Sequence, residues 1–304
     1  MLAWSMLSGH LFFEPIDDPP ARVSSSRRAR MARCEAFWKQ HEPVVLDPLL
    51  ETLIARAGLD VRAYRDRALQ RRLHSCLRAI GESSSTHAIA ALDRRPELFE
   101  RAVDSVLLGV TAFFRDNAVF RLLAERCIPA LQSRHRAERR GLRVWSAGCS
   151  EGHELYSVAL LMEEAGCLAG AELLGTDCRA GAIRSAERGR FDASALQCIP
   201  PALRETAFTI EHGRLCVRPG LRKQLRWRRS DLLRTVEPGP WDMVLCRNVT
   251  IYLKPDAAER VWSALSRVVR NEGYLVVGKA DHPSPELGFR RLASCVYQKI
   301  EGAS

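Results

Sequence analysis

The stretch of residues 142–157 constrains the fold of this chain more than any other part of the sequence. It begins with a short apolar run, passes through a turn that contains Gly148 and Gly152, and continues with apolar residues at helical spacing. Strand, turn and helix in this order make half of a βαβ unit, in which a ligand binds at the carboxyl end of the strand and a glycine lets it approach the backbone. The G-x-x-x-G spacing matches neither the dinucleotide fingerprint nor a phosphate-binding loop. Taken alone, the stretch therefore also fits a plain strand-to-helix connector.

Length and composition limit the classes of protein to which this chain can belong. A chain of 304 residues has room for an α/β domain and a smaller second domain, and 46% hydrophobic with 27% charged residues is typical of a globular protein. No apolar run is long enough for a membrane span, and the N-terminus lacks the basic start of a secretory signal. The ten cysteines include no C-x-x-C and the eight histidines no metal-binding pattern. We expect a cytoplasmic protein without a bound metal.

The pattern along the chain divides it into three parts. Residues 1–42 are rich in proline, serine and arginine and predict a disordered leader. Residues 43–105 carry leucine stripes at helical spacing and predict a small helical domain. Residues 106–304 alternate buried strands with helices, which predicts a parallel sheet that ends in an antiparallel hairpin. Within them, residues 208–229 predict an antiparallel β-subdomain.

The net charge of +10 is concentrated in two places, with a net of +5 over residues 56–80 and +7 over residues 214–229. A helix expected over residues 62–80 puts its leucines on one face and its arginines off that face. Such a basic face is either solvated or a docking surface for an acidic helix or a nucleic acid. The arginines concerned are Arg65, Arg71, Arg72 and Arg78.

Two further features mark the second domain. Phe113 and Phe114 come just before a predicted helix, and because their rings need a cavity to fill, Arg115 would point away from it, either as a surface charge or as a cation over a cleft. Asp177 ends the second predicted strand. An acid at this position binds ribose hydroxyls in many such units, although it can also cap the helix that follows.

In these pieces, taken in order, the chain resembles the CheR family of chemotaxis receptor methyltransferases over residues 49–301. The resemblance implies an α/β fold: a seven-stranded, Rossmann-like sheet of the S-adenosylmethionine-dependent methyltransferases, with a small β-subdomain and an N-terminal all-helical domain. The pieces that carry it are Tyr64 and residues 69–73, 111–115, 143–157, 175–177, 230–233 and 246–252.

The resemblance also implies a cofactor site for S-adenosyl-L-methionine, with S-adenosyl-L-homocysteine as product. Arg115 and Tyr252 would lie nearest the transferred methyl group as the catalytic residues. The carboxylates suit this ligand, since Glu154 fits the methionine ammonium, Asp177 the ribose hydroxyls and Asp231 the adenine edge. The implied cofactor-binding residues are Thr111, Arg115, Ala147, Gly148, Glu154, Asp177, Asp231, Leu232, Asn248 and Val249.

By the same resemblance the activity is that of a protein-glutamate O-methyltransferase, which forms glutamyl methyl esters on chemoreceptor-type signalling proteins. The Arg65, Arg71, Arg72 and Arg78 face would then bind the acidic cytoplasmic helices of a methyl-accepting receptor. We expect a monomer that is recruited to receptor clusters, with no nucleic-acid partner and no insertion into the membrane. The alternatives are a catalytically weak, cofactor-binding regulator of a chemosensory complex and a nucleic-acid methyltransferase that uses the basic regions.

The chain departs from the family pattern at several positions. Gly109 stands where the family usually has asparagine, His153 and Leu155 fall within its Gly-Glu-Glu-Pro-Tyr motif, and Lys279 with Ala280 stand where we place a Ser-Glu pair. The missing asparagine removes one cofactor hydrogen bond, worth about 1 kcal/mol. Family members that grip a receptor tether peptide have a long loop in the β-subdomain. Here the turn is only residues 212–213, so we expect no tether binding.

Overall fold

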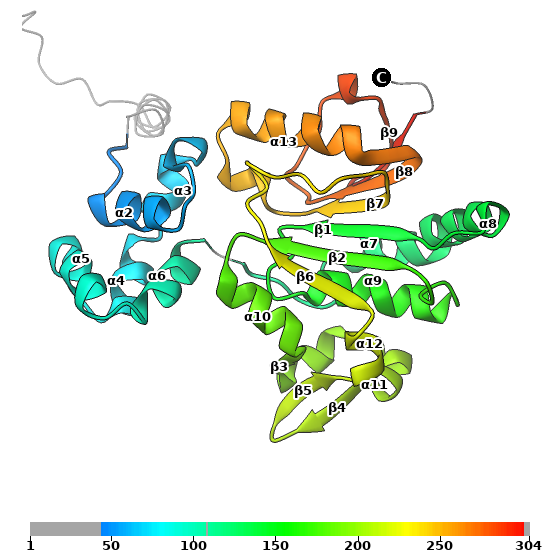
Figure 1. Cartoon of the computed structure of the whole chain (residues 1–304), viewed down its shortest axis with the longest axis horizontal. Coiled ribbons are helices and arrows are strands. Elements are labelled where there is room, and N and C mark those ends of the chain that lie inside the picture. Colours follow the sequence, from blue (N-terminus) through cyan, green and yellow to red (C-terminus); the bar gives the residue numbers. More distant parts are fainter. Residues whose placement is uncertain (1–43, 108, 301–304) are drawn as a thin grey trace, which may run out of the picture. The chain divides into compact units, whose positions relative to one another are not determined.

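A computed structural model describes residues 44–107 and 109–300, of which those from Val45 onward belong to one compact unit (Figure 1). The predicted leader at residues 1–42 lies outside the described residues. Within the described part, no helix is both long enough and apolar enough to cross a lipid bilayer.

Short helices form the first segment of the described chain. The leucine stripe of α2 is buried, and α4 ends at Gly81, whose φ of +82° provides a left-handed C-cap. The helices are α2 (Pro48–Arg56), the 3-10 turn η1 (Val61–Ala63), α3 (Asp66–Gln70), α4 (Leu73–Ile80), α5 (Ser85–Arg94) and α6 (Leu98–Val106).

The single helix expected over residues 62–80 is wrong, because the chain breaks it twice. Tyr64 forms an isolated antiparallel bridge with Leu253, and the Arg65 amide donates to the Tyr252 carbonyl at 2.9 Å. These residues have extended backbone, so their hydrogen bonds go to a distant loop and not to a helical turn. A second break separates α3 from α4 at residues 71–72.

A seven-stranded sheet forms the second segment, in the order β6-β2-β1-β7-β8-β10-β9. The first five strands of this order run parallel, and β10 runs antiparallel to both β8 and β9, as predicted for the terminal hairpin. The strands are β1 (Arg143–Ala147), β2 (Glu172–Asp177), β6 (Leu225–Arg229), β7 (Trp241–Cys246), β8 (Val269–Val277), β9 (Phe289–Ala293) and β10 (Val296–Lys299). From β1 the sheet extends through β2 to β6, and the chain then returns to the opposite side of β1 to form β7. A crevice forms at the carboxyl ends of β1 and β7, where the strand order reverses.

Helices connect the strands of this sheet. The first ten residues of α9 are all buried, the polar His153, Glu154 and Ser157 included, whereas α10 buries only Ala182, Ile183 and Ala186. The helices are α7 (Asn117–Leu122), a π-helical turn (Leu123–Cys127), α8 (Ile128–Glu138), α9 (His153–Glu164), α10 (Ala180–Arg188), α13 (Pro255–Val268) and the 3-10 turns η4 (Thr250–Tyr252) and η5 (Pro285–Leu287).

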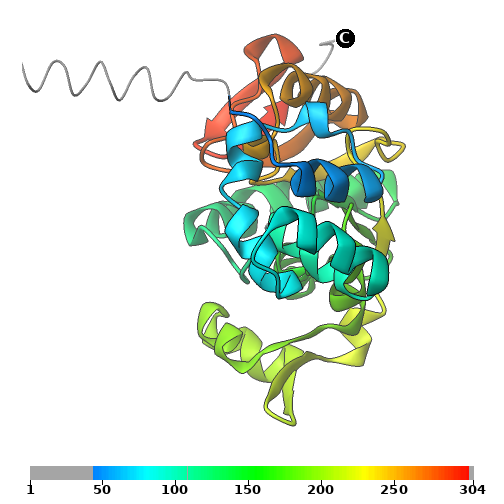
Figure 2. The same cartoon turned by 90° about the vertical axis from the view of Figure 1, so that its left-hand side faces the viewer.

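A separate three-stranded antiparallel sheet has the order β3-β5-β4 and extends away from the larger sheet together with α11 (Figures 1 and 2). Its elements are β3 (Arg190–Asp192), η3 (Ala193–Cys198), α11 (Pro201–Ala207), β4 (Phe208–Glu211), β5 (Arg214–Val217) and α12 (Pro219–Arg222).

The β-subdomain predicted over residues 208–229 is therefore corrected at both ends. Its expected last strand is β6, which pairs in parallel with β2 at the edge of the larger sheet. Trp227 explains this pairing, since a Cβ on Gly175 of β2 would lie only 2.4 Å from the indole ring. The third strand of the small sheet is instead β3, which is too short to give a periodic signal in sequence.

Candidate active site

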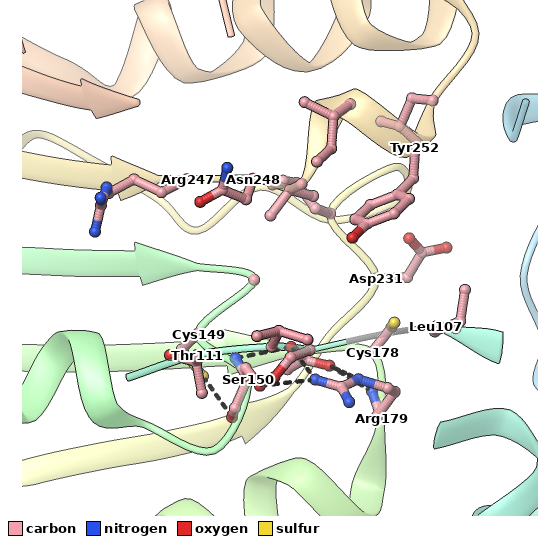
Figure 3. Close-up of a pocket in the computed structure, with 18 of the residues that line it drawn as sticks. Leu107, Thr111, Cys149, Ser150, Cys178, Arg179, Asp231, Arg247, Asn248 and Tyr252 are labelled. Carbon is pink, nitrogen blue, oxygen red and sulfur yellow. Dashed lines mark hydrogen bonds and ion pairs between the residues drawn. The ribbon is translucent and has the colours of Figure 1, made fainter. Parts of the chain in front are cut away.

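A cavity lies at the carboxyl ends of β1, β2 and β7, where the strand order reverses (Figure 3). Its wall also includes the loop before α7 and, from the helical segment, Tyr64 and Leu69. The predicted catalytic and cofactor residues that line it are Thr111, Arg115, Gly148, Glu154, Asp177, Asp231, Leu232, Asn248, Val249 and Tyr252.

Ala147 is the exception among the predicted cofactor residues. It is the last residue of β1 and fully buried, and it does not line the cavity. The turn after β1 does so through Gly148, whose φ is +75°. A Cβ at that position would lie 2.4 Å from Cγ2 of Val249, so only glycine allows the turns after β1 and β7 to approach this closely.

Glu154 stands in the first turn of α9 with both carboxylate oxygens fixed. The Ser146 hydroxyl donates to its Oε1 at 2.8 Å, and Nη1 of Arg247 approaches its Oε2 at 3.3 Å. The side chain is buried at one end of the cavity. A carboxylate held in this way offers its remaining lone pairs to a cationic group such as an ammonium.

Asp177 ends β2 and joins two turns. Its Oδ2 accepts the Ser150 amide at 2.9 Å, and its Oδ1 accepts the Arg179 amide at 2.9 Å and the Arg179 Nε at 3.1 Å. Asp177 thus hydrogen-bonds the residue that precedes α10 and also lines the cavity, while its binding of ribose hydroxyls stays a prediction.

Asp231 has one carboxylate oxygen that is buried without a hydrogen bond from the described residues. Its Oδ1 accepts the Leu233 amide at 3.0 Å, whereas its buried Oδ2 accepts no hydrogen bond, and Nε of Arg234 lies 3.7 Å away. Burial raises the pKa of this carboxyl above its ordinary value. An unpaired buried acceptor is costly, so a ligand that donates a hydrogen bond here, such as an amino group, would be stabilised.

Arg247 joins the loop that carries Arg115 to the cavity, although it was not predicted from the sequence as a site residue. Its Nη2 donates to the Arg115 carbonyl at 2.9 Å and to Oδ2 of Asp116 at 2.7 Å, while Lys279 Nζ lies 2.6 Å from Oδ1 of Asp116. Burial would raise the pKa of Asp116, but the Lys279 hydrogen bond and the charge of Arg247 outweigh it and lower that pKa.

Arg115 is placed by this network at the side of the cavity. Its own guanidinium donates through Nη1 to the Val110 carbonyl at 2.7 Å, five residues earlier in the same loop. Phe113 and Phe114 are buried, as the sequence predicted, and the left-handed φ of +51° at Phe114 and +61° at Asp116 turns the chain sharply around Arg115.

Asp281 is a second residue that the sequence did not mark. Its carboxylate accepts the Asn248 amide and the Gly278 amide, each at 3.0 Å, and the Thr250 hydroxyl. These bonds hold Asn248 in a left-handed conformation with a φ of +59°. Residues 279–280, where we placed the Ser-Glu pair of the family, include no acid. Asp281 provides an acid one position later.

Tyr252 closes the cavity beside the helical segment. Figure 3 shows its hydroxyl directed into the cavity, on the same side as Asp231. The backbone around it is tied to the helical segment by the Arg65 amide and by the Lys254 amide, which donates to Ala63 at 2.8 Å. The Tyr252 turn therefore depends on both segments of the described chain.

The four predicted acceptor-binding arginines do not line the cavity. Nε of Arg65 donates to the Leu253 carbonyl at 2.6 Å, so this residue contributes to the joint with the Tyr252 turn. Arg71 and Arg78 are exposed and Arg72 is half-buried. Within the described part of the chain, no acidic side chain pairs with Arg71 or Arg72.

The strand order, the glycine turn and the three cavity carboxylates define the class of S-adenosylmethionine-dependent methyltransferases with a Rossmann-like sheet. Within that class, the chain belongs to the CheR methyltransferase family, because residues 109–290 match the model of the CheR methyltransferase SAM-binding domain. S-adenosylmethionine is accordingly the cofactor, and the free Oδ2 of Asp231 and the fixed carboxylate of Glu154 fit its amino groups.

Relatives agree with this family. The chain is 27% identical over 224 residues to a chemotaxis protein methyltransferase of Listeria monocytogenes, covering 74% of this chain and 84% of the relative. It is 31% identical over 197 residues to chemotaxis protein methyltransferase 1 of Pseudomonas aeruginosa, covering 62% and 71%. Among solved structures, StiE O-MT residues 942–1257 align over 61% of this chain and 47% of that chain, with 18% identity and a TM-score of 0.33, a value too low to add to the assignment.

Proposed function

We propose that this methyltransferase esterifies glutamate side chains of a chemoreceptor-type signalling protein. The observation that carries the proposal is Arg115, a cation fixed at the side of a cofactor cavity whose other charged groups include carboxylates. A guanidinium in this place suits an acceptor that is itself a carboxylate. The names of the relatives, which are chemotaxis protein methyltransferases, support the receptor as the source of that carboxylate.

The chemistry asks little acid–base help from the protein. A glutamate side chain, with an ordinary pKa of about 4.3, is already ionised at neutral pH. The bound cofactor supplies a methyl group on a sulfonium, which is a good leaving group. One acceptor oxygen forms the new C–O bond while the methyl–sulfur bond breaks and its electron pair stays on sulfur, so no proton moves. Arg115 and Tyr252 would align the acceptor and exclude water, which is the main source of rate.

The fixed anions of the cavity have a separate role in this proposal. Glu154, held by Ser146 and Arg247, would bind the ammonium of the cofactor, and Asp177 its ribose hydroxyls. Arg247 also holds the carbonyl of Arg115. One buried arginine would thus couple the position of the cofactor to the position of the residue that binds the acceptor.

A nucleic-acid acceptor is disfavoured by what the basic region at residues 214–229 does within the protein. Arg218 pairs with Glu163 and Arg228 with Glu237, while Arg222 and Arg229 donate to the backbone carbonyls of Arg188 and Cys178. Four of these side chains thus already have partners within the protein, which reduces the number of donors available to phosphates.

The test is transfer of a radiolabelled methyl group to receptor-containing membranes, with total RNA as the competing acceptor. We expect label on the receptor, and its release in mild alkali, because glutamyl methyl esters hydrolyse in base. Label that resists alkali would indicate nitrogen methylation, and label on RNA alone would overturn the proposal. Cofactor binding without transfer to either acceptor would instead support the regulator alternative.

A further inference from the structure

Arg179 lies in the cofactor cavity but belongs to none of the residue sets proposed above. We propose that Arg179 is a positioning residue, which locks Asp177 and the loop that leads to Arg115 into the cofactor-binding arrangement and does so in space that Gly109 leaves open. The inference rests on the S-adenosylmethionine assignment of the cavity and is independent of the acceptor.

The guanidinium of Arg179 is almost enclosed, with 9% of its side chain exposed, and contacts three elements of the fold. Nε donates to Oδ1 of Asp177 at 3.1 Å, and Nη2 donates to the Ser150 hydroxyl at 3.0 Å (Figure 3). Nη1 lies 3.7 Å from Oδ1 of Asp104 on α6. One planar fork thus ties the ends of β1 and β2 to the helical segment, a task that a single ammonium could not perform.

Gly109 is the steric complement of this fork. A Cβ at residue 109 would lie 2.2 Å from Nη2 of Arg179 and 2.3 Å from Oγ of Ser150, both far inside contact distance. The Ser150 hydroxyl, which accepts from Arg179, donates in turn to the Gly109 carbonyl at 3.0 Å. Even an alanine at residue 109 would therefore displace the guanidinium or the serine.

The next residue carries this arrangement to the catalytic loop. The Val110 carbonyl accepts the Nη1 hydrogen bond of Arg115 at 2.7 Å. A continuous set of hydrogen bonds and one peptide link thus run from Asp177, the ribose-binding acid, through Arg179, Ser150 and Gly109 to the residue that would align the acceptor. Loss of the Arg179 side chain should leave Asp177 held only by the backbone amides of residues 150 and 179, and the loop at residues 109–112 less fixed.

The experiment measures S-adenosylhomocysteine binding by calorimetry on the full chain, which requires no acceptor and no turnover. The variants are Arg179→Ala, Gly109→Ala and the double variant. Arg184→Ala is the matched control, because Arg184 lies on α10, the helix that Arg179 precedes, and pairs with Glu100 of α6, yet it does not line the cavity. Thermal unfolding of each unliganded variant reports on folding separately.

Arg179→Ala should raise the Kd about tenfold, as expected for the loss of one charge-assisted hydrogen-bond set, while Arg184→Ala leaves it unchanged. Gly109→Ala should weaken binding in the wild-type background, and by a smaller factor once Arg179 is absent, because the clash with the guanidinium is then relieved and only the clash with the Ser150 hydroxyl remains. Equal effects of Gly109→Ala in both backgrounds, or wild-type affinity of Arg179→Ala, would overturn the proposal. If Arg184→Ala weakened binding equally, Arg179 would be only a brace between helices, and the proposal would fail.

Discussion

At the scale of single residues, the cavity works through charges that fix one another. Arg247 is buried among aromatic and acidic groups, with its guanidinium carbon 5.6 Å from the Phe120 ring centre, and it holds both Asp116 and the Arg115 carbonyl. Arg115 itself has only a backbone carbonyl as a hydrogen-bond partner among the described residues. Its cationic head is therefore the group left to meet a substrate.

Arg115→Ala should abolish most turnover while it weakens cofactor binding much less. A charge-assisted contact made to the acceptor in the transition state is worth about 1.5–3 kcal/mol, which corresponds to roughly a 10- to 150-fold loss in kcat. Initial rates of receptor methylation and calorimetry with S-adenosylhomocysteine measure the two effects separately. Arg121→Ala, which changes an exposed arginine on α7, serves as the control. Residual activity near that of the wild type would remove Arg115 from the catalytic residues.

His153 gives a prediction in which pH is the variable. It is buried, its ring lies 4.3 Å from Phe191 and 4.8 Å from Phe113, and Nδ1 has no hydrogen-bond partner. Burial lowers its pKa to about 4. The unfolded chain, with an ordinary histidine pKa of about 6.5, binds the proton more readily, so the contribution of His153 to stability is complete above pH 6.5 and is lost as the pH falls toward 4.

His153→Phe should therefore flatten the fall in the free energy of unfolding between pH 6.5 and 4, by about 2 kcal/mol at pH 5. Urea unfolding at several pH values measures this, with His282→Asn at an exposed position as the control. If the free energy of unfolding of the variant fell with pH as steeply as that of the wild type, the buried neutral His153 would not be the cause of the fall.

The sequence anticipated residues whose neighbours in the chain reveal their role. Asp177 ends a buried strand, so its place in the cavity follows from the local pattern, whereas Glu154 was assigned through the resemblance to the family. Asp281 and Arg247 could not be identified in this way, because both act on partners far along the chain, and the contact of Arg179 with Ser150 likewise spans 29 positions. Asp281 binds a residue 33 positions away, and Arg247 reaches across 131 positions to Asp116.

At the scale of elements, the central strands of the larger sheet were predictable from the sequence, whereas the edge strand β6 was not. Strands β7 and β8 are buried apolar runs, and their neighbours in the sheet follow from the βα alternation. Strand β6 carries three arginines in five residues, which argues for a solvent-exposed hairpin, yet Leu225 and Trp227 fix it against β2. The break at Tyr64 was hidden for a similar reason, since its partner is Leu253.

The small sheet supports a prediction about receptor tethering. Strands β4 and β5 are joined by His212 and Gly213, with φ of +49° and +73°, which is the two-residue turn anticipated from the sequence. This turn offers no loop to close over a peptide, so we expect receptor C-terminal peptides to give no heat on calorimetric titration. A complex of micromolar affinity would show that an edge of this sheet, where Ile210 is 56% exposed, is sufficient for binding.

At the scale of the whole molecule, the positive charge is divided between structure and recognition. Near β5 and β6, Arg218 and Arg228 have acidic partners, whereas Arg71 and Arg72 lie between α3 and α4 without acidic partners among the described residues. The helical segment that carries them is joined to the Tyr252 turn through Tyr64 and Arg65. An acidic receptor helix bound there would lie on the same segment that contributes Leu69 to the cavity.

The last prediction follows from this placement. The double charge reversal Arg71→Glu and Arg72→Glu should raise the KM for receptor without changing the affinity for S-adenosylhomocysteine. Exposed ion pairs are worth about 0–1 kcal/mol each, so losing two predicts up to about a thirtyfold rise in KM, and added repulsion increases it. Because such pairs are screened, the difference from the wild type should shrink as salt is raised toward about 0.5 M.

Lys223→Glu with Arg226→Glu provides the matched control, since it changes the net charge by the same amount at exposed positions of the other basic region. If both double variants raise KM equally, long-range attraction by the total charge explains receptor binding. If neither does, receptor recognition by Arg71 and Arg72 is refuted. A rise confined to the Arg71 and Arg72 variant, lost at high salt, would place the acceptor on the helical segment beside the Tyr252 turn.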